Sequence, residues 1–116
     1  MDVTTREFRF LLRQKTRHTT LYTEMIPADA LLHGRGADFL AHDEPTPPVL
    51  QLGSADPGKV ALAGDRAKAA GYTTVNINAG CPSPKVKSGG FGVFLMGEKN
   101  VAAEMVRRLK EAGLSV

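Results

Sequence analysis

The hydrophobic residues of this chain alternate between the spacing of a helix and the spacing of a strand. Phe8, Leu11 and Leu12 recur every three or four residues, which predicts an amphipathic helix over residues 4–16. Capping residues and closing glycines predict three more helices, over residues 28–33, 57–70 and 100–112. Runs of β-branched, aromatic and apolar residues predict strands over residues 20–25, 49–52 and 74–78.

The order of these elements predicts the fold class. Helices alternate with strands, which is typical of an α/β fold whose parallel strands are joined by right-handed crossovers. Two architectures satisfy the order: a small open sheet, or a segment of a (β/α)8 barrel, which needs about 250 residues to close. We expect Gly34 and Gly36 to end the second helix, Asn100 to cap the last one, residues 79–99 to form a long loop, and residues 114–116 to begin another strand.

Composition narrows the class of protein. The 116 residues are 42% hydrophobic and 23% charged, as expected for one globular domain and not for a disordered chain. The sequence contains neither an apolar run of about 20 residues nor a signal-peptide pattern at its start. A lone cysteine, Cys81, excludes an internal disulfide. We therefore expect a cytoplasmic protein that is not in a membrane.

Positive charge gathers in the first 18 residues, which contain five basic residues and only two acidic ones, Asp2 and Glu7. Four of the five form one stripe of the first predicted helix: Arg6, Arg9, Arg13 and Arg17. The sequence alone favours a solvated helix face over contacts with RNA phosphates, the second interpretation of this stripe.

Candidate chemistry centres on the third predicted strand and the loop after it. Asn76 and Asn78 alternate with apolar residues, so both amides face the same side, and Cys81 follows above the carboxyl end of the strand. Gln51 lies near the end of the second strand and faces inward, where it can pair with a cofactor ring or with the neighbouring strand. A thiol in such a place can act as a nucleophile or a proton donor, although an isolated cysteine also often serves only in packing.

Other candidate sites carry less information. The glycine-rich segment at 88–92 can bring backbone amides to a phosphate or can form a tight loop, and it lacks the ending of a P-loop. The three histidines have no ligand-like spacing to Cys81, so no metal site is expected.

Several short motifs point to one family. They are Tyr-Thr-Glu-Met at 22–25, His-Gly at 33–34, Gln-Leu-Gly at 51–53, Asp-Pro at 56–57 and, most specifically, Asn-Ile-Asn-Ala-Gly-Cys-Pro-Ser at 76–83. With these motifs the chain resembles the tRNA-dihydrouridine synthases over nearly its whole length. It most resembles the A-type bacterial subfamily, which modifies uridines 20 and 20a of the D-loop.

The resemblance implies an FMN-dependent TIM barrel, of which residues 1–116 form a single N-terminal segment with about three βα units. NADPH would reduce the flavin, hydride would pass to C6 of a uracil flipped out of the tRNA, and Cys81 would protonate C5. Asn78 matches the family asparagine at the uracil, and Gln51 matches the glutamine at the flavin. Met1 falls at a motif that lies against the flavin.

The family's first strand, later strands and C-terminal helical domain have no counterpart in these residues. We therefore expect a fragment that does not hold FMN tightly and is inactive alone. Two alternatives stay open: a non-catalytic RNA-binding remnant that uses the basic helix, and another flavin barrel that reduces a pyrimidine.

Overall fold

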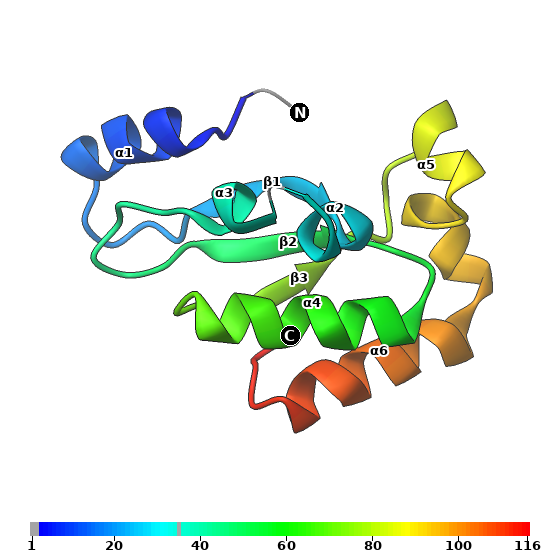
Figure 1. The fold of residues 1–116 in the computed structure, drawn as a ribbon. Helices are drawn as coiled ribbons and strands as arrows, with labels where there is room; N and C mark the ends of the chain where they lie inside the picture. The colour runs from blue at the N-terminus through cyan, green and yellow to red at the C-terminus, as the bar shows by residue number, and fades with distance from the viewer. Residues whose placement is uncertain (1–2, 35) are drawn as a thin grey trace.

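Three parallel strands form the centre of the computed structural model, which describes residues 3–34 and 36–116 (Figure 1). The strands β1 (Tyr22–Pro27), β2 (Val49–Gly53) and β3 (Val75–Ile77) lie in the order β1-β2-β3. The predicted α/β class with parallel strands is therefore confirmed, and it is consistent with part of a TIM barrel. Thr74 also forms a parallel bridge with Ser115, so the last residues do pair beside the third strand.

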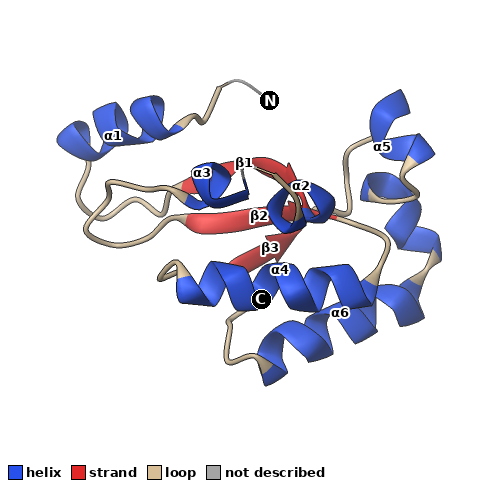
Figure 2. Ribbon diagram, viewed as in Figure 1, coloured by secondary structure: helices blue, strands red, loops and turns tan. Residues whose placement is uncertain are grey.

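Helices pack on the sheet where their small and apolar residues predict it (Figure 2). The main ones are α4 (Pro57–Ala69) and α6 (Lys99–Glu111), which lie side by side, and α2 (Ala28–Leu32), which packs against α4. Their buried side chains join those of β2 and β3 in one hydrophobic core: Leu31, Leu50, Leu52, Val60, Ala63, Ala67, Val75, Met105 and Leu109. This core joins the helices to the sheet.

The start of α4 shows how local sequence sets an element boundary. The Asp56 carboxylate accepts the backbone N–H groups of Gly58 and Lys59 at 2.7 and 3.2 Å, and Pro57 occupies the first helical position. The proline costs no hydrogen bond there, because the first N–H groups of a helix have no partner within it. The predicted helix start at this point is confirmed.

The chain forms two short helices around the position where one helix was predicted to end at Gly36. This residue begins α3 (Gly36–Leu40) instead of ending a helix, so that prediction was wrong. A Cβ atom on Gly36 would overlap the backbone carbonyl of Leu31, and the glycine therefore lets the two short helices pack closely. Helix α3 also buries its last residue, Leu40.

The predicted loop at 79–99 contains two further elements, α5 (Pro84–Ser88) and a 3-10 helix, η1 (Gly92–Gly97). Ser83 and Pro84 mark the start of α5: the Ser83 hydroxyl accepts the N–H of Val86 at 3.4 Å, and Pro84 occupies the first helical position. Asn100 lies inside α6 and does not cap it, since Glu98 occupies the cap position without a side-chain hydrogen bond.

Helix α1 (Arg6–Lys15) lies beyond β1 (Figure 1), and the burial of several of its side chains differs from expectation. Arg9, from the stripe expected to be solvated, is only 4% exposed, whereas Phe10 and Leu11 are 51% and 57% exposed. The Arg9 guanidinium donates to the Glu44 carboxylate at 2.9 Å and to the Thr4 carbonyl at 2.7 Å. A buried ion pair therefore helps to attach this helix to the rest of the protein.

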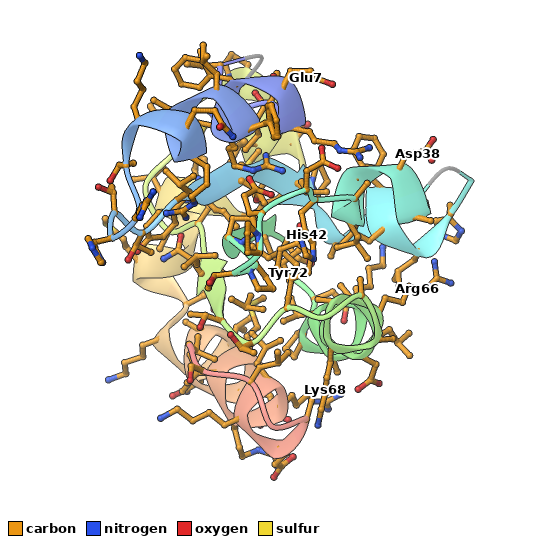
Figure 3. The ribbon with its side chains drawn as sticks, turned by 90° about the vertical axis from the view of Figure 1, so that its left-hand side faces the viewer. Glu7, Asp38, His42, Arg66, Lys68 and Tyr72 are labelled. Carbon is orange, nitrogen blue, oxygen red and sulfur yellow. The ribbon has the colours of Figure 1, made fainter. Side chains whose placement is uncertain are left out.

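Figure 3 looks onto the amino ends of the strands, where the rings of His42 and Tyr72 meet edge to face at 5.2 Å. Burial raises the pKa of the Tyr72 hydroxyl. The polar candidates of the sequence, Gln51, Asn78 and Cys81, lie at the opposite ends of the strands. In residues 3–34 and 36–116, no helix combines the length and the apolar character needed to cross a bilayer.

Candidate active site

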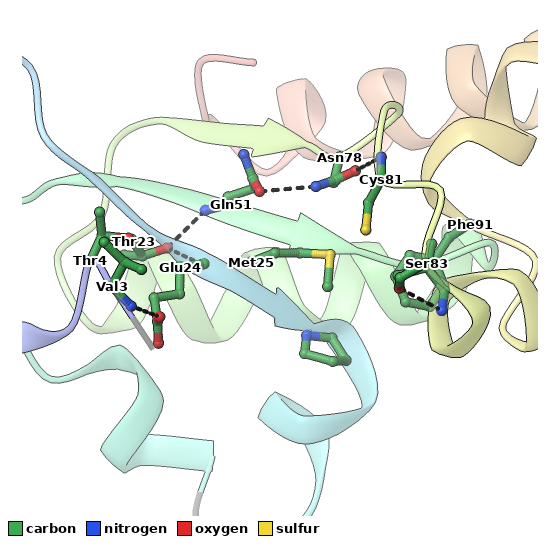
Figure 4. Close-up of a pocket in the computed structure, with 12 residues that line it drawn as sticks. Val3, Thr4, Thr23, Glu24, Met25, Gln51, Asn78, Cys81, Ser83 and Phe91 are labelled. Carbon is green, nitrogen blue, oxygen red and sulfur yellow. Dashed lines mark hydrogen bonds between the residues drawn. The ribbon is translucent and has the colours of Figure 1, made fainter. Parts of the chain in front are cut away.

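A cavity of about 520 Å³ lies at the carboxyl ends of the strands (Figure 4). Its wall includes Met25 of β1, Gln51 of β2, Asn78 after β3 and Cys81 on the following loop. The predicted candidates therefore meet in one place, as expected for residues that follow neighbouring parallel strands. Met1 lies outside the described residues.

The side-chain oxygen of Asn78 holds the loop that carries Cys81. It accepts the backbone N–H of Gly80 at 3.1 Å and that of Cys81 at 3.0 Å. The Asn78 amide nitrogen donates to the Gln51 side-chain oxygen at 3.0 Å. Two of the predicted residues therefore contact each other directly, and one of them fixes the position of the third.

Gln51 is held by both neighbouring strands. Its side-chain nitrogen donates to Asn76 Oδ1 at 2.8 Å, and its backbone N–H donates to Thr23 Oγ1 at 3.0 Å. The sequence left open whether this amide would meet a cofactor or a neighbouring strand, and it meets the side chains of β3 and the loop after it. The Gln51 NH₂ group has a second hydrogen, which takes no part in the bond to Asn76.

The Cys81 thiol points into the cavity, on the side where Met25 lies (Figure 4). Hydrogen bonds from the backbone N–H and the hydroxyl of Ser83 lower the pKa of this thiol below that of an ordinary cysteine. These donors stabilise the thiolate, so the group gives up a proton more readily. Cys81 is half-buried and makes no disulfide, which leaves its thiol available for chemistry.

The cavity wall also includes residues that were not candidate site residues from the sequence, among them Glu24, Met25 and Phe91. Strand alternation indicates Met25, because residues two apart in a strand point to the same face and Thr23, two residues earlier, is buried. Glu24 also reaches the cavity, since the pairing of β1 with β2 shifts between Tyr22 and Met25. Its carboxylate accepts the Val3 N–H at 2.9 Å.

The glycine-rich segment at 88–92 forms a tight loop, the second of its two interpretations. The Phe91 ring occupies the space that a Cβ atom would need on Gly89, and it lies equally close to Gly53 of β2. The glycines thus let an aromatic ring pack against the end of a strand, where it becomes part of the cavity wall.

Three arginines of the basic stripe are engaged within the protein. Arg6 pairs with Asp43, Arg9 pairs with Glu44, and Arg13 donates to the backbone carbonyls of residues 16, 17 and 19. The exposed basic side chains at the end of this helix are Lys15 and Arg17. Arg9 is therefore buried in an ion pair, whereas Arg6 and Arg17 keep exposed side chains.

Residues 1–113 match the family model described as dihydrouridine synthase. The tRNA-dihydrouridine(20/20a) synthase of Escherichia coli strain K12 is 44% identical over 112 residues, which cover 96% of this chain and 32% of that protein. The enzyme of the same name from Synechocystis is 46% identical over 113 residues, or 97% of this chain and 34% of that protein. The chain therefore spans about a third of the length of the curated relatives it matches.

Proposed function

Because the chain belongs to the dihydrouridine synthase family, we propose that it supplies part of an active site that reduces uridines 20 and 20a of tRNA to dihydrouridine. The observation that carries this proposal is the placement of Cys81. Its thiol enters the cavity from a loop that Asn78 holds, beside Gln51 and Met25. A proton donor and side-chain amides thus share one cavity, and they supply the proton and the polar contacts for a pyrimidine ring whose double bond takes its hydride from a reduced cofactor.

We place residues 1–116 as a single segment in the N-terminal part of an FMN-binding TIM barrel. The three parallel strands and the match to a third of each relative support this placement. Other strands of a closed barrel would supply the remaining walls of the site. We therefore propose that residues 1–116 alone neither hold FMN tightly nor turn over.

The residues of the cavity fit a flavin. Met25 and Phe91 offer apolar surface, and the free N–H of the Gln51 amide can donate to a carbonyl or ring nitrogen of a planar heterocycle. When bound and reduced by NADPH, FMN supplies hydride for C6 of the uracil. Gln51 would hold this group, with Met1 proposed as a second contact.

Cys81 donates the proton in this proposal. Its S–H bond breaks, the proton goes to C5 of the uracil, and the remaining thiolate accepts the Ser83 N–H and hydroxyl before taking a proton from solvent. Asn78 already uses its oxygen within the loop, so it would meet a uracil carbonyl through the remaining hydrogen of its NH₂ group.

A chimaera tests this function. Residues 1–113 replace the matching segment of the Escherichia coli relative, and tRNA from a strain that lacks this relative is analysed for dihydrouridine by mass spectrometry. We expect dihydrouridine at positions 20 and 20a with the chimaera and loss of nearly all of it with Cys81→Ala. A folded chimaera that binds flavin but leaves both uridines unmodified would overturn the proposal.

The same chimaera separates the alternatives. Reduction of a free pyrimidine without action on tRNA would favour another flavin barrel. Salt-dependent binding of tRNA without reduction would favour an RNA-binding remnant.

A further inference from the structure

Three side-chain amides form one hydrogen-bonded chain that runs from β3 to the Cys81 loop. Asn76 accepts from Gln51 at 2.8 Å, Gln51 accepts from Asn78 at 3.0 Å, and Asn78 accepts from the loop backbone at 3.0 and 3.1 Å. Each side-chain amide carries an oxygen that accepts and an NH₂ group that donates. In such a chain the oxygen of one amide must face the NH₂ group of the next, so all three amides are oriented in the same sense.

The backbone of the loop fixes this direction. The N–H groups of Gly80 and Cys81 can only donate, so Asn78 must turn its oxygen toward them and its nitrogen toward Gln51. Gln51 must then present its oxygen to Asn78 and its nitrogen to Asn76, which in turn must offer an oxygen. The orientation of all three amides therefore follows from two N–H groups beside the thiol.

We propose that Asn76 is a positioning residue for Cys81, acting through Gln51 and Asn78. Asn76 lies directly opposite Gln51 in the pairing of β3 with β2, so the backbone register holds its oxygen in reach of the Gln51 amide. It does not line the cavity and thus acts only through its neighbour. The effect of Asn76 on catalysis rests on the proposed function, whereas its effect on the position of the Cys81 loop does not.

Without an acceptor at position 76, one end of the Gln51 amide loses its fixed partner. The amide can then rotate away from Asn78, so the Asn78 side chain loses its anchor on Gln51 and holds the N–H groups of Gly80 and Cys81 less firmly. An amide chain of this kind is more than a sum of separate bonds, because each member sets the orientation of the next.

Hydrogen exchange of the 116-residue chain, with neither flavin nor tRNA, tests the proposal separately from the proposed function. In Asn76→Leu and Asn76→Ser, we expect the Gly80 and Cys81 amides to exchange roughly two- to ten-fold faster, the factor that loss of one hydrogen bond gives. Iodoacetamide should also modify the Cys81 thiol at a changed rate. Asn76→Asp keeps an oxygen acceptor and should restore the original rates.

The matched control is Asn100→Ala, on the exposed start of α6, which should leave both amides unchanged. The amides of Leu50 and Leu52 in β2 report global opening. The proposal is overturned if folded Asn76→Ser protects Gly80 and Cys81 as well as the original chain does, or if Asn76→Asp fails to restore protection. Equal acceleration of the β2 amides would also overturn it, since the effect would then be general destabilisation.

Discussion

Gly92 packs directly against the backbone of Cys81. A Cβ atom on Gly92 would overlap the carbonyl oxygen of Cys81 and Cγ1 of Val86, and the N–H of Val93 donates to the same carbonyl at 3.1 Å. Gly92 also has φ of +65°, which a residue with a side chain rarely adopts. The start of η1 thus supports the Cys81 loop on one side, while Asn78 holds it on the other.

Substitution of Gly92 should therefore displace the thiol. We expect Gly92→Ala to lower the free energy of unfolding by about 1–3 kcal/mol, because both backbone strain and overlap act at this position. Urea denaturation measures the loss, and the rate of Cys81 alkylation in the folded protein should change with it. The control is Gly97→Ala, since a Cβ atom on Gly97 meets nothing within 4 Å. Equal effects of the two variants would contradict the expectation.

The second prediction concerns the titration of Cys81. Because Ser83 lowers the pKa of the thiol, the rate of alkylation should rise with pH around a midpoint lower than that of an unstructured cysteine. Ser83→Ala removes the hydroxyl and should move this midpoint upward, while the backbone N–H of residue 83 keeps part of the shift. Reduction of uridine needs the protonated thiol, so activity of the complete enzyme should fall as pH rises through the same midpoint.

Ser83→Thr serves as the control because it keeps a hydroxyl that can donate to Cys81 and cap α5. Its midpoint should match that of the original chain. A midpoint in Ser83→Ala that stays in place would show that the hydroxyl has no part in the titration.

Strand alternation and helix caps were sufficient to predict much of this fold and site. Asn78 and Cys81 were placed together because a polar face and a loop at the carboxyl end of a parallel strand have few possible arrangements. The short helix at Pro84–Ser88 was missed, since five residues show no periodicity. The role of Arg9 has no local signal at all, because its partner Glu44 lies 35 residues away and only the tertiary structure brings them together.

The third prediction follows from that pair. The side chains of Arg9 and Glu44 are 5% and 1% exposed, so removal of one partner leaves the other charge buried and uncompensated. We expect Glu44→Gln to lower the free energy of unfolding by about 3–5 kcal/mol, and Arg9→Met with Glu44→Leu together to recover much of that loss. Urea denaturation of the single and double variants measures both values.

The exposed pair of Arg6 and Asp43 is the matched control for the buried one. Its side chains are 47% and 40% exposed, so solvent screens the pair and Asp43→Asn should lower the free energy of unfolding far less than Glu44→Gln does. A similar loss for both pairs would mean that burial does not decide the energy of the Arg9 contact.

The fourth prediction concerns Thr23, whose hydroxyl takes the place of a strand contact. The pairing of β1 with β2 is irregular between Tyr22 and Met25, and at this point Thr23 Oγ1 accepts the Gln51 N–H at 3.0 Å and donates to the Glu24 carbonyl at 2.7 Å. Thr23→Val keeps the shape but leaves the half-buried Gln51 N–H without this acceptor, which should cost about 1 kcal/mol. It should also speed exchange of the Gln51 amide. Thr23→Ser keeps the hydroxyl and should leave that amide protected, so equal exchange in the two variants would show that the hydroxyl does not hold Gln51.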